Sequence, residues 1–358
     1  MTRRVCYIHV GPHKSGTTSI QWFLQENREE LLDRGYFVPE SETKRGAHHA
    51  LAEGFAGLDV GAHRQELVSR SIRAIAETPA EAIVISSEAL EGLLRNRHHT
   101  KAFFDRIAAL NLEPKLVLFP RNQSQWINSS YSSMVTNFRR SDSFQDCASG
   151  FAISPDATFS RWIDLAETHG AELTARPFTQ ETLRRGVIPE FLLSIGITSS
   201  QFRGHDVRRN EAVGPFTVGV ARDVLRSIAK ELSWLQAKKC TVELAEYLRQ
   251  KGIADSGYCG LSTSLARHIE AKLRSDNDFF AQRLWGKSWA EVFAADVAEE
   301  FTPNDFEIRR PDWLTARRLR HAIRMMKSRA DDILQNPSLA IEAPWNDVAK
   351  RSGLVSRN

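Results

Sequence analysis

The sequence predicts an α/β fold: a mostly parallel central sheet with helices on both faces, followed by a C-terminal helical extension. Up to about residue 196, short apolar segments bounded by turn residues alternate with segments of helical periodicity. This alternation is typical of β-α-β units. After about residue 212, segments of helical periodicity follow one another without a convincing strand between them, which indicates the helical extension.

The apolar segments place the expected elements. Buried strands are expected at residues 5–10, 82–85, 115–119 and 172–178, with a short strand at 35–39. Helices are expected from about 17 to 35, after 86, after 121, and at 180–195, 214–250, 261–298 and 312–336. We therefore divide the chain into an α/β core (1–211), a helical extension packed on the core as acceptor side or lid (212–336), and a tail (337–358) whose prolines and polar end favour disorder.

Composition limits the class of protein. The chain has 358 residues, of which 42% are hydrophobic and 26% charged, as in soluble globular proteins. A net charge of only +4 gives little support to a nucleic-acid partner. Paired arginines are surface features for the most part, although one or two pairs could line an anion site; they are Arg139-Arg140, Arg184-Arg185, Arg208-Arg209 and Arg309-Arg310.

The cysteines and the apolar runs suggest a compartment. Four cysteines lie far apart without a CxxC pair, which argues against a zinc site or a disulfide framework and fits reducing conditions. The first apolar run, residues 5–10, is too short for a signal-peptide core, and no run has the length of a membrane span. A cytoplasmic protein without an integral membrane segment is expected.

The segment between the first strand and the first helix is the most informative. It reads Gly11-Pro12-His13-Lys14-Ser15-Gly16-Thr17-Thr18-Ser19. A loop in this place aims backbone N–H groups and the positive end of a helix dipole at one point. Gly11 and Gly16 permit the close approach, and Lys14 adds positive charge. The segment predicts a phosphate-binding loop; the alternative is a plain strand-to-helix turn in which Thr17 caps the helix.

The loop differs from the common P-loop, GxxxxGK[ST], which binds nucleotides with magnesium. Thr17 stands where that motif has its lysine, and the lysine of this chain lies inside the loop at Lys14. No expected strand ends in an aspartate that could ligate magnesium. A metal-dependent kinase or NTPase is therefore disfavoured, and no metal is expected.

The segment Lys14-Ser15-Gly16-Thr17-Thr18 after a strand resembles the 5′-phosphosulfate-binding loop of PAPS-dependent sulfotransferases (PAPS, 3′-phosphoadenylyl sulfate). The run from Ile8 to Gln21 resembles the bacterial branch of that family. The resemblance implies a P-loop-like fold and PAPS as co-substrate. It also implies a set of donor-binding residues: Gly11, His13, Lys14, Ser15, Gly16, Thr17 and Thr18. The side chain of His13 could touch the donor, but we expect it to point outward.

A second element supports the resemblance. Arg121 follows the strand at 115–119 directly, and Ser129 comes eight residues later. The family carries an arginine and a serine at this spacing, both of which bind the 3′-phosphate of PAPS. An arginine at a strand end can fork onto phosphate oxygens, and Ser129 lies about two helical turns further on. Ser130 is the neighbouring alternative, and a surface arginine with an ordinary helix serine is the plainer interpretation.

Glu88 is the candidate general base, because it follows a buried strand and resembles the position where sulfotransferases carry a catalytic histidine or glutamate. The alternative is an ordinary acid in the first turn of a helix that Ser87 caps. His48 and His49 are the rival bases, expected in a loop after the short strand.

These observations predict a PAPS-dependent sulfotransferase (EC 2.8.2 type). It would transfer a sulfuryl group, without metal, to a hydroxyl or amine of a carbohydrate, glycolipid or small metabolite. Lys14 and Glu88 would be catalytic, with His49 as the alternative base. A P-loop kinase or NTPase and a non-catalytic nucleotide-binding protein are the competing classes. Neither the acceptor nor the oligomeric state is encoded in a motif.

Overall fold

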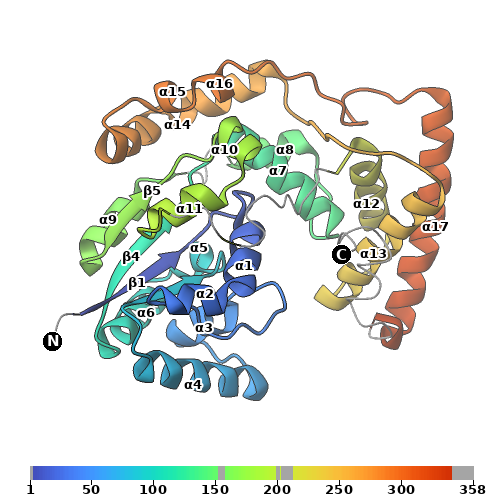
Figure 1. Ribbon diagram of the computed structural model, residues 1–358. Helices are drawn as coiled ribbons and strands as arrows, with labels where there is room; N and C mark the ends of the chain where they lie inside the picture. Colours follow the sequence, from blue (N-terminus) through green and yellow to red (C-terminus); the bar gives the residue numbers. More distant parts are fainter. Residues whose placement is uncertain (1–2, 152–157, 199–201, 203–212, 341–358) are drawn as a thin grey trace. The chain divides into compact units, whose positions relative to one another are not determined.

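The computed structural model describes residues 3–151, 158–198, 202 and 213–340 of the chain (Figure 1). Its sheet has five strands in the order β2-β3-β1-β4-β5, and every pair is parallel. The strands are β1 (Arg4–His9), β2 (Tyr36–Phe37), β3 (Ala82–Ser86), β4 (Leu112–Leu118) and β5 (Glu172–Ala175). The predicted α/β class with a parallel sheet is confirmed.

The register of the sheet places three strand ends together. β1 is central, and its last residue, His9, lies opposite Ser86 of β3 and Val117 of β4. Because parallel strands point the same way, the segments that follow β1, β3 and β4 leave the sheet at one edge. In open parallel sheets this carboxyl edge is where ligands bind.

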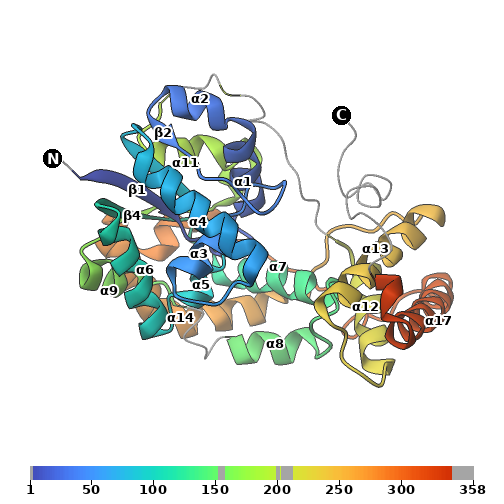
Figure 2. The same cartoon turned by 90° about the horizontal axis from the view of Figure 1, so that it is seen from below.

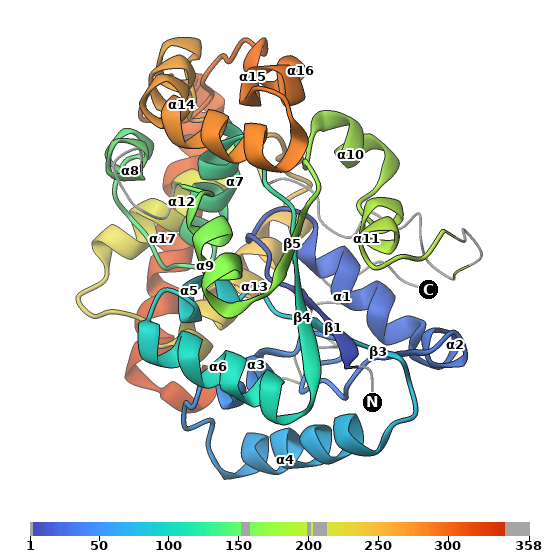
Figure 3. The ribbon, with the colours of Figure 1, turned by 90° about the vertical axis from the view of Figure 1, so that its left-hand side faces the viewer.

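Both faces of the sheet are covered. Side chains alternate along the strands, so Ile8, Ile83 and Leu116 join one buried cluster with α3, α6 and α9. Val84 and Val117 join another with α1 and α11. Figure 3 shows α1 and α11 on one side of the sheet and α3 and α6 on the other. This two-sided burial explains why the strands read as continuous apolar runs.

Contacts divide the chain into two compact units. Unit 1 comprises Met1–Asn122, Thr158–Arg208 and Arg274–Val297, and unit 2 comprises Gln123–Ala157, Arg209–Leu273 and Ala298–Asn358. The blocks expected at 1–211 and 212–336 therefore do not coincide with the units. Residues 123–157 belong with the later helices, and 274–297 belong with the sheet.

The helices of unit 1 surround the sheet. They are α1 (Thr17–Glu26), α2 (Arg28–Asp33), α3 (His49–Phe55), α4 (Ala62–Glu77), α5 (Leu90–Leu93), α6 (Arg97–Ala109), α9 (Arg161–His169), α10 (Gln180–Arg185), α11 (Ile188–Ser194), α15 (Trp289–Val292) and α16 (Ala294–Val297). Two expected long helices are each broken in two. Asn27 lies between α1 and α2, and Gly186, with a φ of 88°, ends α10.

Unit 2 is helical. It contains α7 (Gln123–Thr136), α8 (Phe144–Phe151), α12 (Pro215–Ser227), α13 (Trp234–Gln250), α17 (Trp313–Gln335) and the 3₁₀ turn η2 (Pro337–Ala340); α14 (Thr263–Trp285) begins in unit 2 and ends in unit 1. The expected run of helices after residue 212 is present, but the segment expected as one helix at 214–250 forms α12 and α13, and the segment at 261–298 forms α14, α15 and α16. Residues 341–358 lie outside the described residues. Among the described helices, none combines the length and the apolarity needed to cross a membrane.

A buried ion pair joins the parts of unit 2. The guanidinium of Arg222 on α12 makes two hydrogen bonds to the carboxylate of Asp305, at 2.8 and 2.9 Å. The hydroxyl of Tyr258 donates to Asp305 (2.6 Å), and Arg222 donates to the hydroxyl of Tyr131 on α7 (3.1 Å). Both charged side chains are almost completely buried. The pair therefore connects α7 and α12 with the two loops that contain Tyr258 and Asp305. Breaking these buried bonds would cost much free energy.

We expect Asp305→Asn to lower the free energy of unfolding by about 3–5 kcal/mol, because it removes the buried carboxylate that accepts two hydrogen bonds from Arg222 and leaves only the partly exposed carboxylate of Glu307, 3.3 Å away. Asp331→Asn on α17 is the matched control: its bond to Lys327 is exposed, so we expect a loss below about 1 kcal/mol. Urea unfolding at neutral pH measures both, and equal losses would contradict the role of the pair.

Candidate functional site

Main-chain hydrogen bonds join the three segments at the carboxyl edge of unit 1. The amide of Ser87 donates to the carbonyl of His9 (3.0 Å), and the amide of Phe119 donates to the carbonyl of Gly11 (3.1 Å). The loop after β1 is thus held between the segment that leads to Glu88 and the one that leads to Arg121. The parallel register and these main-chain bonds bring the three segments together.

The loop itself has an unusual backbone. Gly11, Lys14 and Gly16 have φ values of 97°, 67° and 82°, in the left-handed region that a non-glycine residue such as Lys14 rarely adopts. The hydroxyl of Ser15 donates back to the carbonyl of Pro12 (2.6 Å) and holds the turn closed. Alternating backbone conformations of this kind turn successive N–H groups toward one side.

The loop leaves a row of donors unused. In the described part of the chain, the successive amides from Lys14 to Thr18 donate to no acceptor. Gly16 is the N-cap of α1, and no side chain caps that helix, so the interpretation of Thr17 as a mere cap does not fit. A row of unsatisfied amides at a helix N-terminus is the arrangement that binds a phosphate.

Gly16 is required at its position for two reasons. Its φ of 82° strains any L side chain, and an added Cβ would lie 2.8 Å from Cγ1 of Val187 and 3.2 Å from the ring of Phe178. Val187 and Phe178 belong to the buried cluster that covers this face of the sheet. Core packing therefore fixes the shape of the loop.

Two cations border the loop. Arg121 donates through Nη1 to the carbonyl of Lys14 (2.9 Å), and its guanidinium lies 5.7 Å from the ring of Phe178. Burial, and secondly the charge of Arg121, lower the pKa of Lys14. The Lys14 ammonium has no hydrogen bond or ion pair within the described residues. A bound anion would raise the pKa of Lys14 again, because it would supply a counter-charge to the ammonium.

Glu88 lies on the other side of the loop, in the turn before α5. Nε2 of Gln21 on α1 donates to Oε2 of Glu88, while His13 and His49 each place a ring nitrogen 3.9 Å from Oε1. Burial alone would raise the pKa of Glu88, but the two histidines, a main-chain N–H and Gln21 together lower it. Glu88 is therefore ionised at neutral pH. It precedes the helix that begins at Leu90, so it does not open that helix as expected.

The histidines near Glu88 differ in what they can do. His49 is the first residue of α3, and its Nδ1 lies 2.8 Å from the hydroxyl of Ser87. Ser87 thus orients the ring of His49 and does not cap α5. His48 accepts the amide of Ser86 on Nδ1 and faces the carbonyl of Pro39 with Nε2, and burial lowers its pKa to about 4. With both ring nitrogens engaged, His48 is a neutral structural residue.

The predicted residues in unit 1 therefore come together. The loop residues, Glu88, His49 and Arg121 lie at one edge of the sheet. The ring of His13 is mainly exposed but has one nitrogen 3.9 Å from Glu88. Ser129 belongs to α7 in unit 2, where its carbonyl accepts the hydroxyl of Ser132. The roles of Ser129 and Ser130 in binding a 3′-phosphate stay predictions.

Sequence reasoning did not assign three residues of this site. Gln21 holds Glu88; Glu91 accepts the amide of His13 through Oε2 (3.3 Å); and Arg45 lies within electrostatic range of Glu88. Gln21 could have been found, since it lies one helical turn after Thr17 on a stripe that is otherwise buried and apolar. Arg45 and Glu91 carry no such signal.

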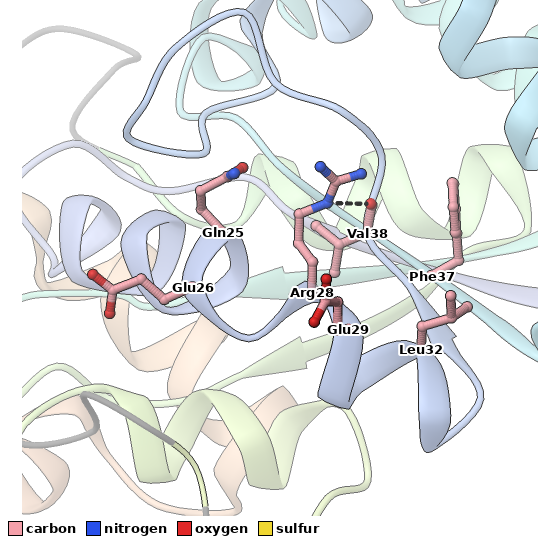
Figure 4. A pocket seen from close by; sticks show the side chains of 7 residues that line it. All are labelled: Gln25, Glu26, Arg28, Glu29, Leu32, Phe37 and Val38. Atoms are coloured by element: carbon pink, nitrogen blue, oxygen red, sulfur yellow. Dashed lines mark hydrogen bonds between the residues drawn. The ribbon is translucent and has the colours of Figure 1, made fainter.

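A cavity of about 500 Å³ lies elsewhere in unit 1, beside α1, α2 and β2 (Figure 4). Its lining residues are Gln25, Glu26, Arg28, Glu29, Leu32, Phe37 and Val38. Nε of Arg28 donates to the carbonyl of Val38 across it (3.2 Å). None of the loop residues lines this cavity.

Comparison with known proteins adds no assignment: no family model, no curated protein and no solved structure gives a significant match to this chain. The site must therefore be interpreted from its own geometry.

We expect Gly16→Ala to destabilise unit 1 by more than Gly170→Ala. Both positions have a positive φ, but an added Cβ meets Val187 only at Gly16 and open space at Gly170. Backbone strain alone costs about 1–2 kcal/mol, and the clash adds to it. Thermal unfolding of the two variants measures the difference; equal shifts would contradict the close approach.

Proposed function

We propose that this chain is a PAPS-dependent sulfotransferase of the α/β, P-loop-like kind. The observation that carries the proposal is the row of amides from Lys14 to Thr18 beside the Lys14 ammonium, none of which has a partner in the described part of the chain. Such a site is shaped for a doubly charged phosphate or phosphosulfate group.

The position of the lysine favours a phosphosulfate over a metal-bound triphosphate. In the common P-loop the lysine follows the second glycine and a hydroxyl behind it ligates magnesium. Here Lys14 lies before Gly16, in the turn itself, with its carbonyl held by Arg121. In this position the Lys14 ammonium can lie close to the bridging oxygen of the 5′-phosphosulfate. There it would neutralise the negative charge that magnesium neutralises in kinases.

Each residue then has a part in one in-line transfer. Glu88, oriented by Gln21, accepts the proton of the acceptor hydroxyl or amine while the acceptor atom bonds to sulfur. The bond between sulfur and the bridging phosphate oxygen breaks, and its electron pair stays on that oxygen, where Lys14 balances the charge. The products are the sulfated acceptor and adenosine 3′,5′-bisphosphate (PAP).

We expect Lys14→Met to weaken the binding of PAP by roughly 10- to 150-fold, the value of one charge-assisted hydrogen bond. The melting temperature should change little, because Lys14 has no side-chain partner to lose within the described residues. Calorimetric titration of both proteins with PAP, ATP and ATP plus magnesium is the measurement. Binding of ATP that requires magnesium would favour a kinase or NTPase instead.

We expect Glu88→Gln to retain PAP binding and to lose transfer from labelled PAPS by 10²- to 10⁴-fold across a panel of hydroxyl and amine acceptors. Because the pKa of Glu88 is lowered from 4.5, its base form persists on acidification. The wild-type kcat/KM should therefore stay level from neutral pH to about pH 5. A decline between pH 6 and 7 would indicate that a histidine takes the proton.

The enzymatic proposal would be contradicted if the wild-type protein bound PAP but, like Glu88→Gln, transferred the sulfuryl group to no acceptor. That result would favour a non-catalytic nucleotide-binding protein.

A further inference from the structure

Helix α17 in unit 2 presents an outward face that combines arginines with large apolar side chains. Two neighbouring stripes at the helical spacing i, i+4, i+7, i+11 make up this arginine face: Trp313, Arg317, Arg320 and Arg324, and Leu314, Arg318, His321 and Met325. All eight residues are exposed, with Trp313 at 70%. Trp313, Leu314 and Met325 are the exposed apolar side chains of this face.

The opposite face of α17 is already occupied. Ala322, Met326, Ala330 and Ile333 are buried in the apolar cluster of unit 2, where α17 packs on α12 and α13 (Figures 1 and 2). The apolar residues on the arginine face are therefore additional to those the fold needs. They do not belong to the helix's packing stripe.

The arginine face has no internal counter-charge. Residues 313–330 contain no aspartate or glutamate. Within the described residues, Arg317, Arg318, Arg320 and Arg324 form no ion pair. Arg317 lies over the ring of Trp313, 5.7 Å from its centre. The face thus offers uncompensated positive charge, preceded along the chain by the exposed residues Ile308, Arg309 and Arg310.

We propose that the arginine face of α17 docks onto an anionic lipid surface. Arginines at such a surface are attracted by the phosphate and carboxylate headgroups, and tryptophan prefers the boundary between headgroups and acyl chains. Leu314 and Met325 lie on the stripe beside the arginines, so they can enter the same boundary when the helix lies flat. The proposal is independent of the proposed transfer reaction.

Lipid fits the face better than a nucleic acid does. Four arginines could bind phosphates of either partner, and Trp313 could stack on a base. Leu314, Met325 and Ile308 have no planar group for stacking, and each exposes about half of its surface. A headgroup region accommodates aliphatic and aromatic side chains together with arginine. A nucleic-acid backbone interacts favourably only with the arginine charges.

The test is sedimentation of the full chain with vesicles of phosphatidylcholine alone and of phosphatidylcholine mixed with phosphatidylserine. We expect binding only to the mixed vesicles, and its loss at high salt. Arg317→Gln/Arg320→Gln/Arg324→Gln should weaken it roughly a hundredfold, since each arginine contributes about fivefold. Trp313→Ala should weaken it several-fold.

Two matched controls separate the face from general effects. Arg73→Gln/Arg106→Gln/Arg184→Gln removes the same charge from exposed positions in unit 1 and should leave vesicle binding within about twofold of wild type. Trp234→Ala removes another exposed tryptophan that lies near a lysine and should have no effect.

Three results would overturn the proposal. They are equal binding to both kinds of vesicle, no binding to either kind, and an equal loss of binding in the variants of the arginine face and in the control variants. Tighter binding to single-stranded or duplex oligonucleotides than to mixed vesicles at the same salt concentration would overturn it as well. Thermal unfolding of each variant shows whether it folds. We expect every variant to fold, because all the substituted side chains are exposed.

Discussion

The left-handed backbone of the loop after β1 is the constraint on which the candidate site depends. Lys14 adopts a φ of 67° without being glycine, at a cost of about 1–2 kcal/mol. That conformation persists because its surroundings impose it: Arg121 holds the Lys14 carbonyl, and Val187 and Phe178 pack against Gly16. In the described part of the chain, the amides from Lys14 to Thr18 donate to no acceptor, so they are available to a bound anion.

The charges at this edge of the sheet are separated. Lys14 and Arg121 lie at the loop, whereas Glu88 accepts a hydrogen bond from Gln21, faces the histidines His13 and His49, and has Arg45 within electrostatic range. If Glu88 were paired with Lys14, each would satisfy the other and neither could serve a substrate. The hydrogen bond from Gln21 fixes the carboxylate of Glu88, which forms no ion pair with Lys14 within the described residues.

The sequence predicted the features that depend on local pattern. The buried strands, their parallel arrangement and the loop at 11–16 follow from apolar runs and from glycine spacing, which act over a few residues. The division into units was not predictable, because α7 and the second half of α14 join their units through contacts distant in sequence. His48 and His49 look alike in sequence, and only their partners, Pro39 and Ser87, make one structural and leave the other near Glu88.

Net charge alone does not indicate either of the two proposed anion-binding features. The value of +4 is small, yet Lys14 and four arginines on the outer face of α17 form no ion pair within the described residues. At Arg222 and Asp305 opposite charges are buried together and serve the fold. On the outer face of α17 and at Lys14, the described structure provides no such partner. The location of the nearest carboxylate therefore separates the cation that serves the fold, Arg222, from the cations for which we propose a binding role.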